Sequence, residues 1–142
     1  MLKTILVALD GSEIQERVIQ SLEELQLQPT TKIVLAHVVP AIDLSQEVAG
    51  DRPQAVEGLP YLLIEKQLQS YQAKIPGESI IEIVTGDPAE EIIRLANIYQ
   101  ADLIAIGSRG LTGVKRIIQG SVSSQVVENA PCSVLVVKPA RN

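Results

Sequence analysis

The 142-residue sequence contains no phenylalanine, no tryptophan and only three tyrosines. Proteins that bind single-stranded nucleic acid stack its bases on aromatic side chains. This composition therefore argues against such a function, and also against an aromatic sugar-binding cleft. The single cysteine excludes a disulfide framework within the chain and any multi-cysteine zinc or iron–sulfur site. The single histidine excludes the common metal motifs that use two histidine ligands.

Long apolar runs are also missing, since none reaches the roughly 18 residues of a membrane-spanning helix. The first apolar run, ILVAL, ends at Asp10-Gly11, which is too short for a signal peptide core, and no small-residue cleavage site follows it. We therefore expect a cytoplasmic protein. The hydrophobic content of 46% and a length near the commonest domain size predict one globular domain over residues 1–142.

The formal net charge of −5 does not favour binding to nucleic acid or to an acidic membrane surface. The charge is unevenly distributed. Residues 1–106 carry 7 basic and 16 acidic side chains, a net of −9, whereas residues 107–142 carry 5 basic and 1 acidic, a net of +4. This difference arises by chance over a short window or marks an anion-binding site in the last quarter of the chain.

Aliphatic runs alternate along the chain with segments of helical periodicity. The expected strands cover residues 5–9, 32–39, 79–84, 102–106 and 133–137. The expected helices run from 12 to about 25, near 61–74, from 88 onward and from near 121 to 129, with a long loop over 40–60. Helices that alternate with buried strands predict an α/β fold, a doubly wound parallel sheet with helices on both faces.

Local signals predict where two of the helices begin. Ser12 and Gln15 have the spacing of a capping box, and Asp87-Pro88 with Glu90 is a typical helix start. The polar Glu82 within the run SIIEIV indicates a strand at the edge of the sheet. Ser121, Ser123 and Ser124 are expected to open the last helix.

The segment after the fourth strand is unusually rich in glycine. Gly107, Gly110, Gly113 and Gly120 fall within fourteen residues, and Arg109 and two other basic residues lie between them. Glycines allow the backbone to approach a ligand closely, and a helix N-terminus offers free N–H groups to phosphate. Arginine and hydroxyl groups add donors. The segment therefore predicts a polyphosphate site, and the alternative is a plain strand-to-helix loop.

Two better-known nucleotide loops are absent. No glycine is followed by Lys-Ser or Lys-Thr, as a Walker A loop requires, and only Gly11 follows the first strand, where a Rossmann fingerprint needs three glycines.

The motif that remains is Gly107-x-x-Gly110, nine residues, then Gly120-Ser121. It matches the G-2x-G-9x-G-[S/T] signature of the universal stress protein family, in its nucleotide-binding branch. The opening ILVALDGSE, the segment AHVV, the Gly86-Asp87-Pro88 turn and the ending APCSVLVVK resemble that family too. The resemblance spans nearly the whole chain.

The resemblance implies a five-stranded sheet in the order 3-2-1-4-5, Rossmann-like and similar to the adenine nucleotide alpha hydrolases. It also implies ATP, with Mg²⁺ as a possible companion, bound between the first and fourth strands. The adenine and ribose would lie against residues 8–10 and the Val38 backbone. The phosphates would lie against Gly107 and the loop that follows. The implied nucleotide-binding residues are Ala8, Leu9, Asp10, Val38, Ile106, Gly107, Arg109, Gly110, Gly113, Gly120, Ser121, Val122 and Ser123.

Three other residues have more than one interpretation. Asp10 is a turn residue of the Asp-Gly type or a contact to ribose or metal. His37 lies within an aliphatic strand, where a structural histidine with satisfied hydrogen bonds is expected rather than a catalytic one. Cys132 begins the last strand and is expected to pack as a small apolar residue, not to act as a nucleophile.

Three functions follow from these observations. The first is a regulatory, stress-response protein that binds ATP and changes conformation or protein partner with occupancy. The second is a slow ATP hydrolase or nucleotidyl transferase, for which the sequence supplies no clear general base, so enzymatic activity stays undecided. The third is a dimeric interaction module without nucleotide. In the implied order the apolar fifth strand lies at a sheet edge, and both this and the family resemblance predict a homodimer through it. The alternative is a strand covered by the C-terminal tail.

Overall fold

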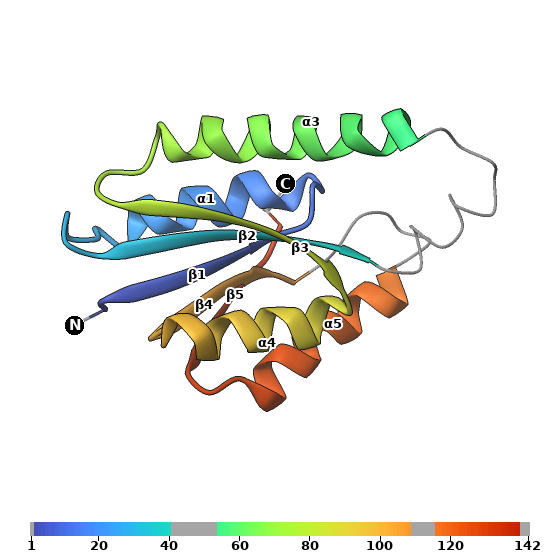
Figure 1. Ribbon diagram of the computed structural model, residues 1–142. Coiled ribbons are helices and arrows are strands. Elements are labelled where there is room, and N and C mark those ends of the chain that lie inside the picture. Colours follow the sequence, from blue (N-terminus) through green and yellow to red (C-terminus); the bar gives the residue numbers. More distant parts are fainter. Residues whose placement is uncertain (1, 41–53, 109–115, 140–142) are drawn as a thin grey trace.

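The computed structural model describes residues 2–40, 54–108 and 116–139. Five parallel strands form one sheet in the order β3-β2-β1-β4-β5 (Figure 1). The strands are β1 (Thr4–Leu9), β2 (Lys32–Pro40), β3 (Ser79–Gly86), β4 (Leu103–Gly107) and β5 (Ser133–Val137). The α/β class, the parallel sheet and its order are as predicted.

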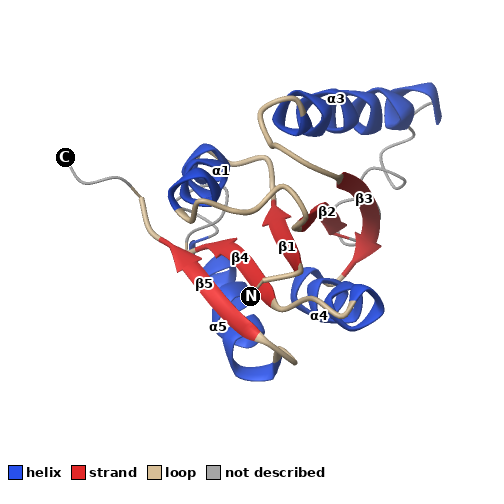
Figure 2. Cartoon of the chain, turned by 90° about the vertical axis from the view of Figure 1, so that its left-hand side faces the viewer, coloured by secondary structure: helices blue, strands red, loops and turns tan. Residues whose placement is uncertain are grey.

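Helices lie on both faces of this sheet, as Figure 2 shows. One face is covered by α1 (Ile14–Glu24) and α3 (Gln54–Gln72), and the other by α4 (Pro88–Tyr99) and α5 (Arg116–Asn129). In the described ranges, no helix combines the length and the apolar character needed to cross a membrane.

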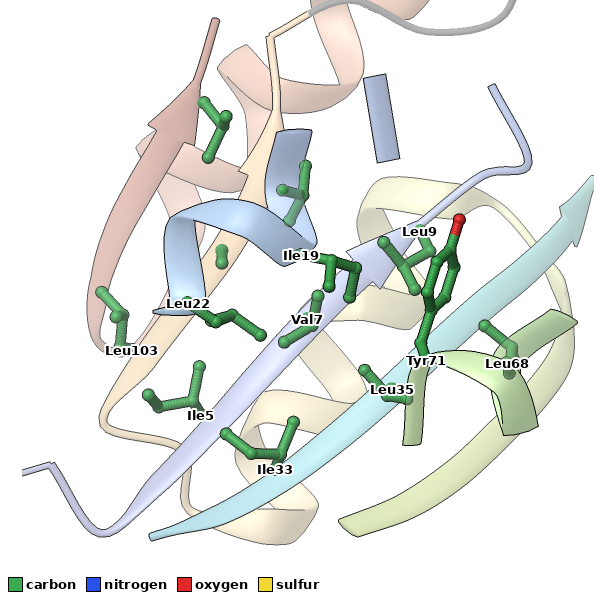
Figure 3. Packing of buried hydrophobic residues seen from close by; sticks show 13 residues of the cluster. Ile5, Val7, Leu9, Ile19, Leu22, Ile33, Leu35, Leu68, Tyr71 and Leu103 are labelled. Atoms are coloured by element: carbon green, nitrogen blue, oxygen red, sulfur yellow. The ribbon is translucent and has the colours of Figure 1, made fainter. Parts of the chain in front are cut away.

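The core consists of two layers, one on each face of the sheet. On the α1 and α3 face, alternate residues of β1 and β2 meet Leu22 and Tyr71 (Figure 3). The Tyr71 hydroxyl donates a hydrogen bond of 2.9 Å to Glu16 Oε2. Burial, with Glu16 as the next cause, raises the pKa of Tyr71 to about 12. The other layer packs β1, β2 and β4 against α4 and α5. A sheet buried on both faces explains why its central strands are continuous aliphatic runs.

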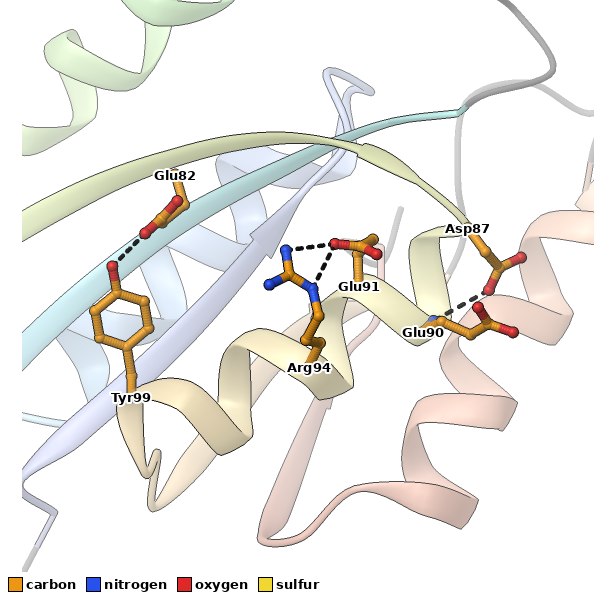
Figure 4. A network of polar contacts seen from close by, with 6 residues as sticks. All are labelled: Glu82, Asp87, Glu90, Glu91, Arg94 and Tyr99. Atoms are coloured by element: carbon orange, nitrogen blue, oxygen red, sulfur yellow. Dashed lines mark hydrogen bonds and ion pairs between the residues drawn. The ribbon is translucent and has the colours of Figure 1, made fainter.

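The edge strand β3 is secured to α4 by polar contacts (Figure 4). Asp87 caps α4 by accepting a 3.0 Å hydrogen bond from the Glu90 N–H, as the sequence predicts. Glu82 accepts a hydrogen bond from the Tyr99 hydroxyl, and its strand lies at the sheet edge as expected. The Lys32 ammonium lies 5.4 Å from the centre of the Tyr99 ring.

The predicted start of the first helix was wrong in detail. Helix α1 begins at Ile14, and its N-cap residue Glu13 makes no side-chain cap. The Ser12 hydroxyl donates a hydrogen bond to Asp10 Oδ1, and none of the described N–H groups of the helix donates to its oxygen. In a capping box, Gln15 would accept a hydrogen bond from the Ser12 N–H. Its Oε1 instead accepts a hydrogen bond from the Gly11 N–H, one residue earlier.

Two other helices begin earlier than predicted. Helix α3 begins at Gln54, inside the stretch expected to be a loop, and α5 begins at Arg116. Ser121, Ser123 and Ser124 therefore lie within α5 and do not open it. The segment from Arg116 to Gln119 consists of residues without a strong helix breaker, so the helix continues back past Gly120.

Candidate functional site

An open pocket lies where β1, β2 and β4 end, at the edge of the sheet where ligands bind in open α/β folds. The strand order reverses here, because β1 leads on one side to β2 and on the other to β4. The pocket is lined by Ala8, Leu9, Asp10, Ile14, Gln15, Val18, His37, Val38, Pro40, Pro88, Ile92, Ile106, Gly107, Val122 and Ser123.

The pocket brings together every predicted nucleotide-binding residue whose side chain belongs to the described part. These residues are Ala8, Leu9, Asp10, Val38, Ile106, Gly107, Val122 and Ser123. Gly120 and Ser121 lie in α5, and their side chains are outside the described part. Arg109, Gly110 and Gly113 lie outside the described residues.

The turn after β1 holds the Asp10 carboxylate in a fixed orientation. Its Oδ1 accepts hydrogen bonds from the Ser12 N–H at 2.9 Å and the Ser12 hydroxyl at 2.5 Å. Gly11 has a φ of +82°, a left-handed conformation that glycine adopts without strain. No hydrogen bond among the described residues uses Asp10 Oδ2. One carboxylate oxygen thus remains available at the pocket.

Gly107, the last residue of β4, allows α1 to approach the end of the sheet. A Cβ atom at this position would lie 2.7 Å from Ile14 Cγ2, far closer than a normal contact. Ile14 is the first residue of α1 and lines the same pocket. The glycine therefore has a packing role in addition to any ligand contact.

His37 also lines the pocket, at the end of β2 beside Leu9 of β1. Burial lowers the pKa of His37 from its ordinary value of 6.5, and the negative charge of Asp10 opposes this effect. The ring makes no hydrogen bond within the described residues. The residue is buried as expected, but its ring forms none of the hydrogen bonds to protein groups that a structural histidine commonly makes.

A metal cluster is not found, since the described residues contain no group of three or more histidine, cysteine or acidic side chains that could hold an ion. One free carboxylate oxygen is nevertheless compatible with Mg²⁺ that arrives bound to phosphates, because this ion commonly takes one or two protein carboxylates and keeps several waters. Asp10 fits a shared ion and does not form a metal site by itself.

Cys132 lies directly before β5, is not among the residues that line the pocket, and is half-buried. Burial raises the pKa of its thiol, and the charge of Asp102 adds to this effect. A raised pKa disfavours the reactive thiolate. Both observations agree with a packed cysteine.

Several lining residues were not predicted as site residues, among them Gln15, Val18 and Ile92. They belong to helices, and the predictions followed the ends of the strands. The Asp87-Pro88 helix start was recognised, and its position directly after β3 was the one signal that could have placed Pro88 at the same edge.

A family model described as the universal stress protein family matches residues 1–138. The chain belongs to the universal stress protein family. A universal stress protein of Thermus aquaticus is 34% identical over 142 residues, which cover 97% of this chain and 100% of the relative.

Solved structures share the fold of this chain. The structure of a protein called MJ0577 is similar with a TM-score of 0.85 and 25% identity, over 99% of this chain and 98% of the other. A universal stress protein in complex with cAMP has a TM-score of 0.70 and 20% identity, over 96% and 97% of the two chains. A family member from Arabidopsis thaliana with AMP bound has a TM-score of 0.65 and 24% identity, over 97% and 92%.

Proposed function

We propose that this universal stress protein binds ATP in the pocket at the ends of β1, β2 and β4 and acts as a nucleotide-dependent regulator in a stress response. The observation that carries the proposal is the pocket itself, whose lining includes all the predicted nucleotide-binding residues with described side chains. Two proteins of the same fold carry the adenine nucleotides cAMP and AMP, which supports an adenine nucleotide here.

In this proposal the base and sugar occupy the part of the pocket near Ala8, Asp10 and Val38. The lining there is mostly aliphatic, which suits the faces of a purine, and Asp10 offers an acceptor to a sugar hydroxyl. Such a site selects the base largely through backbone groups, so few side chains need to identify it.

The triphosphate would extend toward Gly107 and α5. The sequence has serines at positions 121 and 123 of that helix, and Arg109, Gly110, Gly113 and Gly120 complete the signature in the sequence. The charge distribution supports this direction, because residues 107–142 carry a net of +4. Mg²⁺ would accompany the phosphates and supply the positive charge that reduces repulsion from Asp10.

Calorimetry of the nucleotide-stripped protein with Mg-ATP, ATP in EDTA and AMP tests the proposal. We expect micromolar binding of Mg-ATP, weaker binding of ATP without Mg²⁺ and weaker binding still of AMP, which lacks two phosphates. Gly110→Val should reduce the affinity in a protein that still folds. Absence of nucleotide binding by the wild type would refute the proposal and leave a function as an interaction module.

We also propose that the protein forms a homodimer through β5. This strand lies at one end of the strand order, and its residues Val134, Leu135 and Val136 are half-buried in the single chain. An apolar strand at a sheet edge offers unpaired backbone groups to a second copy.

A further inference from the structure

The pocket wall contains one polar side chain to which the proposed function gives no role, the imidazole of His37. The side chain is 8% exposed, and its ring has no hydrogen bond within the described residues. No buried side-chain nitrogen or oxygen of these residues lacks a partner. The unbonded ring nitrogens must therefore reach the open space of the pocket, since they would otherwise be buried without a partner.

The polar edge of the ring faces the turn that carries Asp10. The ring atom Cε1, which lies between the two nitrogens, is 3.6 Å from the position that a Cβ atom on Gly11 would occupy. Asp10 is also the residue whose charge acts on the ring. An imidazole and the unbonded Asp10 Oδ2 thus lie at the same end of the pocket.

The protonation state of the ring determines what this pair can bind. Burial disfavours the charged imidazolium, so His37 is neutral at neutral pH, with one nitrogen as a donor and the other as an acceptor. Asp10 and His37 are the two titratable groups in the described lining. A neutral donor beside a carboxylate acceptor matches a ligand with two adjacent hydroxyl groups, because each hydroxyl both donates and accepts.

We propose that His37 determines specificity for the sugar of the nucleotide: its ring N–H donates to one ribose hydroxyl, while the other hydroxyl donates to Asp10 Oδ2. This inference rests on the proposed nucleotide site and adds to it a preference for ribonucleotides over deoxyribonucleotides. A buried polar group that loses its ligand partner is left unpaired, which is how protein sites reject analogues that lack a hydroxyl.

Binding of Mg-ATP, Mg-2′-deoxyATP and Mg-3′-deoxyATP to the same protein tests the inference. We expect the wild type to bind each deoxy analogue about fivefold more weakly than ATP, the effect of one net hydrogen bond. His37→Leu removes the donor and keeps an apolar side chain in the layer that holds Leu9. It should bind ATP and one of the two analogues, the one that lacks the hydroxyl paired with His37, with equal affinity, and should still discriminate against the other. His37→Gln keeps an N–H donor and should retain part of the preference.

The ratio of affinities separates this role from a structural one. If the role of His37 is purely structural, its replacement should weaken the binding of ATP and of deoxyATP by the same factor. An unchanged ratio of these two affinities in His37→Leu would therefore overturn the inference. Equal binding of all three nucleotides by the wild type would overturn it while leaving the nucleotide site intact. No ATP binding by the wild type would overturn both. If His37→Leu does not fold, as thermal unfolding would report, the wild-type ratio and the His37→Gln ratio decide the matter.

Discussion

A methyl group added at Gly107 is expected to destabilise the protein through one contact at the base of the pocket. The added Cβ atom would lie 2.7 Å from Ile14 Cγ2 and 3.3 Å from two other atoms of that side chain. Carbon atoms pack best at about 3.5–4.0 Å, so the nearest pair must separate by about 1 Å. Isoleucine is stiff at its first side-chain torsion, and Ile14 is only 9% exposed, so the start of α1 has to move.

We expect Gly107→Ala to lower the free energy of unfolding by about 1–3 kcal/mol, the usual cost of overpacking. With an unfolding entropy of about 2.1 cal/mol/K per residue, a loss of about 2 kcal/mol lowers the midpoint of thermal unfolding by about 7 °C for a chain of this length. Circular dichroism measures this shift. Nucleotide affinity should fall as well, since both residues line the pocket.

A double-mutant cycle with Ile14→Ala identifies the contact as the cause. Ile14→Ala alone should cost about 2 kcal/mol or more through the cavity it leaves. In the double variant, the new methyl group partly fills that cavity, so the combined loss should be smaller than the sum by about 1 kcal/mol or more. Gly11→Ala is the matched control. Its Cβ would make only an ordinary contact, and its cost comes from a φ of +82°, so Ile14→Ala should not rescue it. Strictly additive effects of Gly107→Ala and Ile14→Ala would refute the reasoning.

Two further predictions concern acid stability and assembly. Hydrogen bonds from the Thr4 and Lys3 N–H groups lower the pKa of Asp102 below its ordinary value of 3.8. The Asp102 carboxylate therefore stabilises the fold at any pH above the unfolded-state pKa. This contribution disappears as the pH falls through the folded-state pKa. Urea unfolding should therefore show that Asp102→Asn has a lower free energy of unfolding than the wild type at neutral pH, and the difference should shrink in acid. A difference in unfolding free energy that does not depend on pH would contradict this assignment. For the proposed dimer, light scattering should give twice the chain mass, and the β5 amides that face away from β4 should be protected from hydrogen exchange at high concentration and exposed on dilution. A monomer at all concentrations would exclude pairing through β5.

The strands could be predicted because their signal depends on few competing interactions. A strand buried on both faces is largely apolar, and ILVAL, KIVLAHVV and LIAI are continuous or nearly continuous aliphatic runs of this kind. The helix starts are harder, because several polar groups compete for the same partners. Ser12 has the right residue type and spacing for a cap, but its hydroxyl donates a hydrogen bond to Asp10 Oδ1. Helix α1 begins at Ile14 without a side-chain cap.

The part of the site that strands form was predictable from the strand ends, whereas Val122 and Ser123 of α5 were predicted only through the family resemblance. Parallel strands end at one edge of the sheet, so Asp10, Val38 and Gly107 had to lie near one another once the order was known. Which turn of a helix faces that edge depends on how the crossover packs. Ile14 and Ile92 reach the pocket through packing that sequence periodicity does not specify, since periodicity gives the buried side of a helix and not its position along the strands.

The turn Asp10-Gly11-Ser12, where the start of the first helix was predicted wrongly, contributes to the pocket. The two hydrogen bonds from Ser12 hold Oδ1, which leaves Oδ2 as the oxygen available to a ligand. Gln15, 3% exposed, holds the Gly11 N–H, so the turn is fixed from both sides. A carboxylate oriented before binding loses little conformational freedom when a ligand arrives, and this lowers the entropic cost of binding. Ser12 thus orients Asp10, and α1 begins without a side-chain cap.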